Sequence, residues 1–307
     1  MARYRLTSIR LMVLALALLA AALVALGSVM TLWSGPATAS ERGAARPEQP
    51  PRCTPASPCL AVVIDDVGRE LSQLRRLLDS RLDLTFSVLP HGERTEQSLD
   101  ALRAAGREIM LHLPMAPLDS NKITDERVVL GRDGPLGPAL QACLAKVPDA
   151  VGVNNHMGSA LSKDQGRVRR VLESLGGQSR SASRALQAGA GGPPPPLWFL
   201  DSRTVAGSRF CSTARQIGIR CLERDFFLDD PPHPSAVRSR LAEAVALAKR
   251  RGWAVAIGHP LRSTVDALRT LRVGSRVRVV RLSALLALAE VPQEWQPCDL
   301  TGQPTGT

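Results

Sequence analysis

The histidines of this chain are placed where a metal or catalytic site would need them. The chain holds five histidines, and four of them lie at the end of a short apolar run: His91, His112, His156 and His259. Other polar residues occupy matching places, namely Asp65, Asp66, Asn155 and Asp201. One carboxylate and two neutral imidazoles can hold a divalent metal, with zinc favoured by these ligand types, and leave positions open for water and substrate. Because such a metal lowers the pKa of bound water to about 7 and polarises a carbonyl, these residue types predict hydrolysis.

These residues are far apart in the sequence, so the elements between them must bring them together. Short apolar runs alternate with amphipathic stretches, and the runs are 60–64, 84–89, 108–113, 150–153, 197–200, 219–222, 253–257 and, more weakly, 277–281. Helical spacing of apolar residues predicts helices over 70–78, 95–105, 136–146 and 235–251. Alternating strands and helices without hairpin signals predict parallel strands joined by crossover helices.

The predicted fold class is therefore α/β. About seven or eight such units form either a barrel or a doubly wound sheet. Because no glycine-rich phosphate-binding loop follows the first run, a barrel is favoured. In parallel β/α folds the loops after the strands converge at one end, where ligands bind. This rule is the reason to expect the polar residues to meet.

Each of these residues also has a simpler interpretation. Asp65 and Asp66 could cap the helix that follows them, and His112 could be a core histidine bonded to a carbonyl group. His91 and Asp201 fit a supporting place behind the ligands as well as direct contact. The sequence alone does not show that the side chains converge.

Residues 1–39 predict export. Three arginines within the first ten residues precede a charge-free, largely apolar run at 11–33. This run is long enough for a spanning helix and longer than the usual signal-peptide core of about 7–15 residues, while 37–39 fits a signal peptidase site. Segment 1–39 is thus a signal peptide or an N-terminal membrane anchor. In both cases the domain is expected in the periplasm or cell envelope, with membrane contact only through 11–33.

The remaining composition sets the expected domain limits and excludes one class of partner. The expected divisions are a Pro-rich linker at 40–58, a domain at 59–291 with a low-complexity insertion loop at 176–196, and a tail at 292–307. The net charge is +11, but the basic residues are spread over the chain and aromatics make up only 3%, which argues against nucleic-acid binding. Six cysteines without a C-x-x-C motif predict one or two disulfides of unknown pairing.

Six motifs occur in a fixed order over roughly residues 60–272: IDDVG, TFSVLPH, EIMLHLPM, VGVNNHMGS, FLDSRT and AIGHP. In this series the chain resembles the divergent polysaccharide deacetylase family, an outlying branch of the NodB-type carbohydrate esterases. The resemblance implies a single-domain, distorted (β/α) barrel of about seven parallel strands. It also implies metal-dependent removal of acetyl groups from an N-acetylated polysaccharide or peptidoglycan.

The resemblance further implies roles for particular residues. In the NodB-type pattern the first aspartate of the pair is the base and the second binds the metal, which assigns Asp65 and Asp66. His259 matches the late histidine that acts as general acid. The usual second motif supplies two histidines on one segment, but this chain offers only His112 there, so His156 is expected to complete the ligand set. The supporting or substrate-binding positions are then His91, Asn155 and Asp201.

Two functions remain in view. The first is an exported, metal-dependent deacetylase. The alternative is a catalytically weak or inactive relative that binds glycan or an envelope partner through the same groove, because the second motif departs from the family pattern. A metal hydrolase acting on another substrate, such as a phosphoester, has less support, since no H-x-H pair follows the first strand.

Overall fold

The computed structural model describes residues 52–122, 128–132, 134–186, 197–272 and 276–288. The expected signal or anchor segment, most of the linker and the expected tail lie outside these residues. Among the helices that the structure does describe, none is both long enough and apolar enough to span a bilayer.

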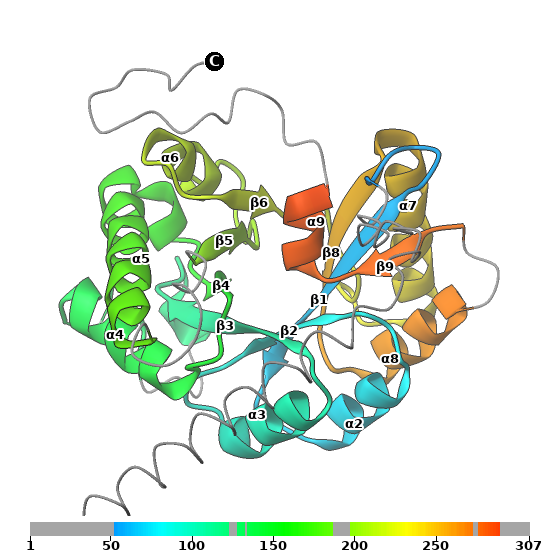
Figure 1. Ribbon diagram of the computed structural model, residues 1–307, viewed down its shortest axis with the longest axis horizontal. Coiled ribbons are helices and arrows are strands. Elements are labelled where there is room, and N and C mark those ends of the chain that lie inside the picture. The colour runs from blue at the N-terminus through cyan, green and yellow to red at the C-terminus, as the bar shows by residue number, and fades with distance from the viewer. Residues whose placement is uncertain (1–51, 123–127, 133, 187–196, 273–275, 289–307) are drawn as a thin grey trace, which may run out of the picture. The chain divides into compact units, whose positions relative to one another are not determined.

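Parallel strands form a single curved sheet, as the sequence predicts (Figure 1). The strands are β1 (Cys59–Val67), β2 (Thr85–Val88), β3 (Glu108–Met115), β4 (Gly152–Met157), β5 (Trp198–Asp201), β6 (Cys221–Glu223), β7 (Phe226–Phe227), β8 (Trp253–Gly258) and β9 (Arg278–Val280). Their order is β6-β5-β4-β3-β2-β1-β8-β7, and β9 pairs with β1. The (β/α) barrel prediction is confirmed as an open barrel with β6 and β7 at its ends. Among the strands of the described residues, the two-residue strand β7 is the one that the sequence did not predict.

Helices cover the outside of the barrel, except for the last one, which lies inside the ring of strands (Figure 1). They are α2 (Ser72–Asp79), α3 (Thr95–Ala104), α4 (Leu136–Lys146), α5 (Gln165–Leu186), α6 (Phe210–Gln216), α7 (Pro234–Arg251), α8 (Arg262–Leu268) and α9 (Leu282–Leu288), with short 3₁₀ turns at Ser120–Lys122, Leu161–Lys163 and Arg269–Arg272. The four helices predicted from apolar spacing correspond to α2, α3, α4 and α7, within two residues at each end.

Because side chains alternate between the two faces of each strand, the core has an outer and an inner layer. On β1, Leu60 and Ile64 belong to the outer cluster between strands and helices, whereas Ala61 and Val63 belong to the inner cluster. The buried leucines of α9 complete the inner cluster, and Figure 1 shows this helix inside the ring of strands. Because successive side chains point to opposite faces, Asp65 is the next inward residue after Val63. The inner layer thus becomes polar at the carboxyl ends of the strands.

The expected insertion loop at 176–196 is wrong in its first half. Helix α5 continues through Gly176 and Gly177 to Leu186, and residues 187–196 lie outside the described part. The first turns of α5 bury Val168 and Leu175 at helical spacing. This apolar stripe anchors the helix, and the alanine, arginine and leucine residues that follow have high helix propensity. Low complexity in the sequence therefore concealed a helix.

Two disulfides lie among the described cysteines, within the number expected. Cys53 pairs with Cys59 and Cys211 pairs with Cys221, while Cys143 is free and buried. The first bridge fastens the end of the expected linker to the first residue of β1. The second joins α6 to the end strand β6.

Candidate metal centre

The two aspartates at the end of β1 reach the same site because the backbone bends between them. Asp65 is inward-facing and 2% exposed. In a regular strand Asp66 would point to the opposite face, but its φ of 55° lies in the left-handed region, which aspartate tolerates better than most residues. The register with β2 also shifts between Ile64 and Val67. As a result both carboxylates approach His112 Nε2, Asp65 Oδ2 at 3.7 Å and Asp66 Oδ1 at 3.2 Å.

The helix after β1 is capped by a different carboxylate. Glu70 accepts the backbone N–H groups of Ser72 at 3.1 Å and Gln73 at 2.9 Å. The simpler interpretation, in which Asp65 and Asp66 cap this helix, is therefore wrong.

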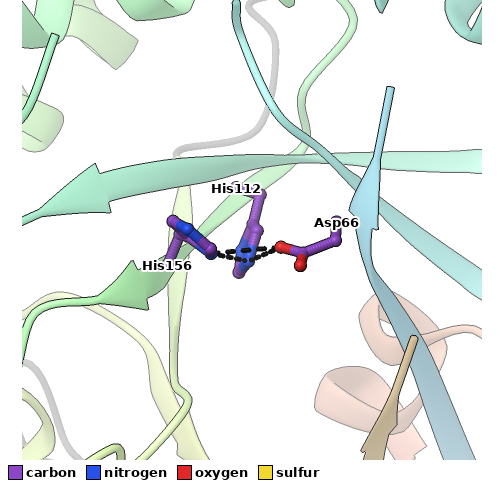
Figure 2. A group of neighbouring side chains, drawn as sticks. All are labelled: Asp66, His112 and His156. Carbon is purple, nitrogen blue, oxygen red and sulfur yellow. Dashed lines mark hydrogen bonds and ion pairs between the residues drawn. The ribbon is translucent and has the colours of Figure 1, made fainter. Parts of the chain in front are cut away.

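Asp66, His112 and His156 converge from three strands, as Figure 2 shows. His156 Nδ1 lies 3.1 Å from both Asp66 Oδ1 and His112 Nε2, and the third edge of this triangle is the 3.2 Å contact between Asp66 and His112. The edge of a tetrahedron with metal–ligand bonds of about 2.0 Å is about 3.3 Å, so the spacing suits one small divalent cation. Among the described residues, these three form the group of ligand atoms that could hold a metal ion.

The hydrogen bonds of His112 leave an unprotonated nitrogen facing this triangle. Asn154 Nδ2 donates to Asp65 Oδ1 at 2.8 Å, so its Oδ1 is the atom that lies 2.8 Å from His112 Nδ1 and must accept a proton from it. In the neutral ring, His112 Nε2 then presents a lone pair to the carboxylate of Asp66, whose buried Oδ1 makes no hydrogen bond of good geometry. Two lone pairs at this distance repel each other. A metal ion between them would remove this repulsion.

The surroundings of Asp66 favour its anionic form. Burial raises the pKa of Asp66, but the contacts with His112 and His156 outweigh it and hold the pKa far below its usual range. Asp66 is therefore an anion at any ordinary pH. The side chain of His112 is only 3% exposed, whereas those of His156 and Asp66 are 14% and 25% exposed, so the cluster opens on the side of the latter two.

Asp65 is held in conditions suited to a base. Burial raises its pKa, and the charges of His112 and His259 and the hydrogen bond from Asn154 lower it by less, so the net pKa of Asp65 is raised. A carboxylate with a raised pKa accepts a proton from water more readily than an ordinary one.

His259 is paired with a buried carboxylate that the sequence analysis did not single out. Asp229 Oδ1 lies 2.8 Å from His259 Nδ1, and Asp229 Oδ2 accepts the backbone N–H of His259 and the hydroxyl of Thr264, each at 2.6 Å. Burial lowers the pKa of His259, but the hydrogen bond and charge of Asp229, together with the charges of Asp65 and Asp66, raise it to about 9. His259 is thus a cation at neutral pH and carries a proton on Nε2.

An arginine and an aromatic ring form the wall beside His259. Arg224 lies where the chain crosses from β6 to β7, and its guanidinium stacks over the ring of Phe227 at 3.7 Å. The same ring stacks against His259 with centroids 6.1 Å apart. Arg224 Nε and Nη2 also donate to the backbone carbonyls of Ser202 and Arg203. These contacts join the loop after β5 to the strand that carries Asp229.

Three of the expected supporting residues lie away from the cluster. His91 lines a different pocket, between α3 and the end of α4. Asn155 bonds to backbone, donating to Met157 O at 2.8 Å and accepting from Ser202 N at 2.9 Å. Asp201 accepts the backbone N–H of Arg203 at 2.8 Å and so shapes the loop after β5. Asn155 and Asp201 point away from the cluster because side chains alternate along a strand, and these two occupy outward positions on β4 and β5.

The same alternation of side chains identifies inward-facing residues that the sequence analysis missed. Asn154 shares a face with His156, two residues along β4. Ser87 is an inward position of β2 and Ser202 directly follows β5, and both contact the Asn154 amide. Asp229 follows a strand of only two residues, which is too short for a pattern of apolar residues to reveal.

Comparisons with known proteins agree with this geometry. A family model described as divergent polysaccharide deacetylase matches residues 62–287. The chain belongs to this family of divergent polysaccharide deacetylases. The matched range contains every member of the candidate site, from Asp65 to His259.

Individual relatives extend the comparison. An uncharacterized protein of Haemophilus influenzae is 31% identical over 210 residues, which cover 68% of this chain and 69% of that protein. The protein YibQ of Escherichia coli K12, also described as uncharacterized, is 28% identical over 242 residues, covering 78% and 70%. A solved structure of an uncharacterized protein from Agrobacterium tumefaciens C58 superposes with a TM-score of 0.63 at 19% identity, over 75% of this chain and 89% of that one. This last likeness supports the fold alone.

Proposed function

We propose that this divergent polysaccharide deacetylase is an exported, metal-dependent hydrolase that removes acetyl groups from N-acetylated polysaccharide or peptidoglycan. The observation that carries the proposal is the triangle of Asp66, His112 and His156, with edges of 3.1–3.2 Å, beside a buried base and a charged histidine. The match to the divergent polysaccharide deacetylase family supports the proposed substrate class, an N-acetylated sugar polymer.

In this proposal Asp66 Oδ1, His112 Nε2 and His156 Nδ1 hold one divalent metal, with zinc favoured by the mixture of one oxygen and two nitrogen donors. When bound, the metal supplies polarisation of the acetamide carbonyl and a lowered pKa for a neighbouring water. His156 takes the place of the second histidine of the usual NodB-type motif. It reaches the site from β4 rather than from the segment that carries His112.

Two side chains of the protein then accept and donate the protons of the reaction. Asp65, with its raised pKa, takes a proton from the attacking water. His259 donates the proton on Nε2 to the leaving amine, while Asp229 holds Nδ1 and balances the positive charge before the transfer. Deacetylation needs one group that accepts a proton and another that donates one, and the two sit on neighbouring strands β1 and β8.

Two disulfides support the proposal of export. Disulfides persist in oxidising compartments such as the periplasm and are rare in the cytosol. The pairs Cys53–Cys59 and Cys211–Cys221 both have bonded geometry. Together with the arginines and apolar run at the N-terminus, they favour a place in the cell envelope, with segment 1–39 as signal or anchor.

The proposal is tested by incubating the zinc-loaded protein with N-acetylglucosamine oligomers and measuring released acetate and free amine. Asp65→Asn serves as the matched inactive control, since it keeps the side-chain volume and removes the base. Release by the native protein and not by the variant supports the proposal. Stoichiometric zinc without any release on these oligomers or on peptidoglycan contradicts it.

The alternative is a catalytically weak or inactive relative that binds glycan through the same groove. The feature that favours it is the second motif, where His112 is followed by Leu113, Pro114 and Met115 instead of a second histidine. Metal content separates the two functions. Protein purified without chelators that contains no metal, yet binds glycan, favours the alternative.

A further inference from the structure

We propose that Asn154 is a positioning residue that sets the base and a metal ligand together through one side-chain amide. The inference deepens the proposed function, on which it rests, by adding a residue that neither touches the metal nor moves a proton. Asn154 is fully buried on β4, two residues before His156 and on the same face of the strand.

Each half of the amide serves a different functional group. Oδ1 accepts from His112 Nδ1 at 2.8 Å and from the hydroxyl of Ser87. Nδ2 donates to Asp65 Oδ1 at 2.8 Å and lies 3.3 Å from Ser202 Oγ. The amide therefore bridges the proposed ligand and the proposed base directly.

The orientation of the amide is fixed by Asp65. Turning the amide over would place its oxygen against the carboxylate of Asp65. This contact would be repulsive, and a buried polar group without a partner costs roughly 1–3 kcal/mol. The native orientation forces the proton of His112 onto Nδ1 and so keeps the lone pair of Nε2 directed at Asp66.

The neighbouring residue shows how this differs from a purely structural role. Asn155 bonds to the backbone of Met157 and of Ser202, and it contacts neither His112 nor Asp65 in any hydrogen bond of the described residues. Asn154 bonds to side chains that the mechanism uses. A positioning role for Asn154 therefore predicts effects beyond a change in stability.

Two variants separate the halves of the amide. Asn154→Asp keeps an oxygen for His112 but has no N–H for Asp65, whereas Asn154→Leu has a similar volume and loses both contacts. We expect Asn154→Asp to bind zinc at least as tightly as the native protein while kcat falls about 10- to 100-fold at little change in KM. We expect Asn154→Leu to lose about 10- to 100-fold in zinc affinity as well.

The readouts are zinc affinity by competition with a chelator, and the ¹⁵N shifts of the His112 ring in the metal-free protein, which report the nitrogen that carries the proton. The Nδ1–H form should dominate in the native protein and in Asn154→Asp and should be lost in Asn154→Leu. A native kcat in Asn154→Asp, or an unchanged ring tautomer and zinc affinity in folded Asn154→Leu, would overturn the inference. The ring tautomer is measured without substrate or metal, so a native protein that lacks deacetylase activity contradicts the proposed function and leaves this test in force.

Discussion

Asp229 holds His259 from two directions, through the ring Nδ1 at 2.8 Å and through the backbone N–H at 2.6 Å. The two residues follow the adjacent strands β7 and β8 and lie 30 positions apart in the chain. A backbone bond and a ring bond to one carboxylate fix both the position of the residue and the rotation of its ring. His259 is therefore preorganised to present Nε2 to the site.

Asp229→Asn should shift the alkaline limb of the pH–activity profile to lower pH. The native pKa of His259 is about 9, so activity that needs its proton is present at neutral pH and is lost as the pH rises through about 9. The variant removes the negative charge that raises this pKa, so the limb should shift toward the ordinary histidine value of about 6.5. The measurement is kcat/KM for N-acetylglucosamine oligomers against pH. An unshifted limb would show that another group supplies the proton.

His156→Ala should weaken zinc binding by at least about 100-fold, because it removes one of three ligands. His233→Ala is the matched histidine control. His233 is exposed and caps α7 by accepting the N–H of Ser235, so its loss should cost stability of roughly 1 kcal/mol and leave zinc affinity unchanged. Both affinities are measured by chelator competition. Equal effects of the two substitutions would mean that the site is wrongly placed.

Asp65→Asn should separate catalysis from metal binding. Asp65 lies 3.7 Å from His112 Nε2 but stands outside the 3.1–3.2 Å triangle, so the variant should bind zinc normally. Loss of the base should lower kcat by about 10²- to 10⁴-fold. Metal content by elemental analysis and kcat on the same sample decide the matter. A variant that loses its zinc along with its activity would make Asp65 a ligand instead.

Removal of the Cys211–Cys221 disulfide should destabilise the fold. The bridge closes a loop of 10 residues between α6 and β6, and a loop of that length is worth about 2–3 kcal/mol through the entropy of the unfolded chain. Urea unfolding of Cys211→Ser/Cys221→Ser, compared with the native protein under oxidising conditions, measures the difference. Identical urea midpoints and m-values for the variant and the native protein would contradict the expected stabilisation by this disulfide.

The sequence predicted the residues of the metal triangle because a single rule locates them: in a parallel β/α barrel, ligands bind at the carboxyl ends of the strands. Asp66, His112 and His156 each follow an apolar run and lie in the carboxyl-terminal half of β1, β3 and β4, and parallel strands of a barrel end at the same rim. The observed convergence confirms that they lie together, while their role as ligands stays a prediction. Helices α2, α3, α4 and α7 were equally accessible, since α7, for example, combines regular apolar spacing with a glycine stop at Gly252.

The remaining site residues depended on details that position in the sequence does not carry. The sequence analysis named Asn155 and not Asn154. Both come at the end of the same apolar run, and only the alternation of side chains relative to His156 shows which one faces inward. Asp229 was missed because β7 has just two residues. His91 was misplaced because β2 ends at Val88 and the chain then turns toward α3. In each case the register of a strand, and not residue type, decided the outcome.

A crystal structure of the protein soaked with zinc, with anomalous diffraction recorded at the zinc edge, tests the central claim most directly. We expect one fully occupied zinc ion per chain, bound by Asp66 Oδ1, His112 Nε2 and His156 Nδ1 at about 2.0–2.2 Å. A chain without zinc between these three side chains, or with zinc held only by other residues, would contradict the account.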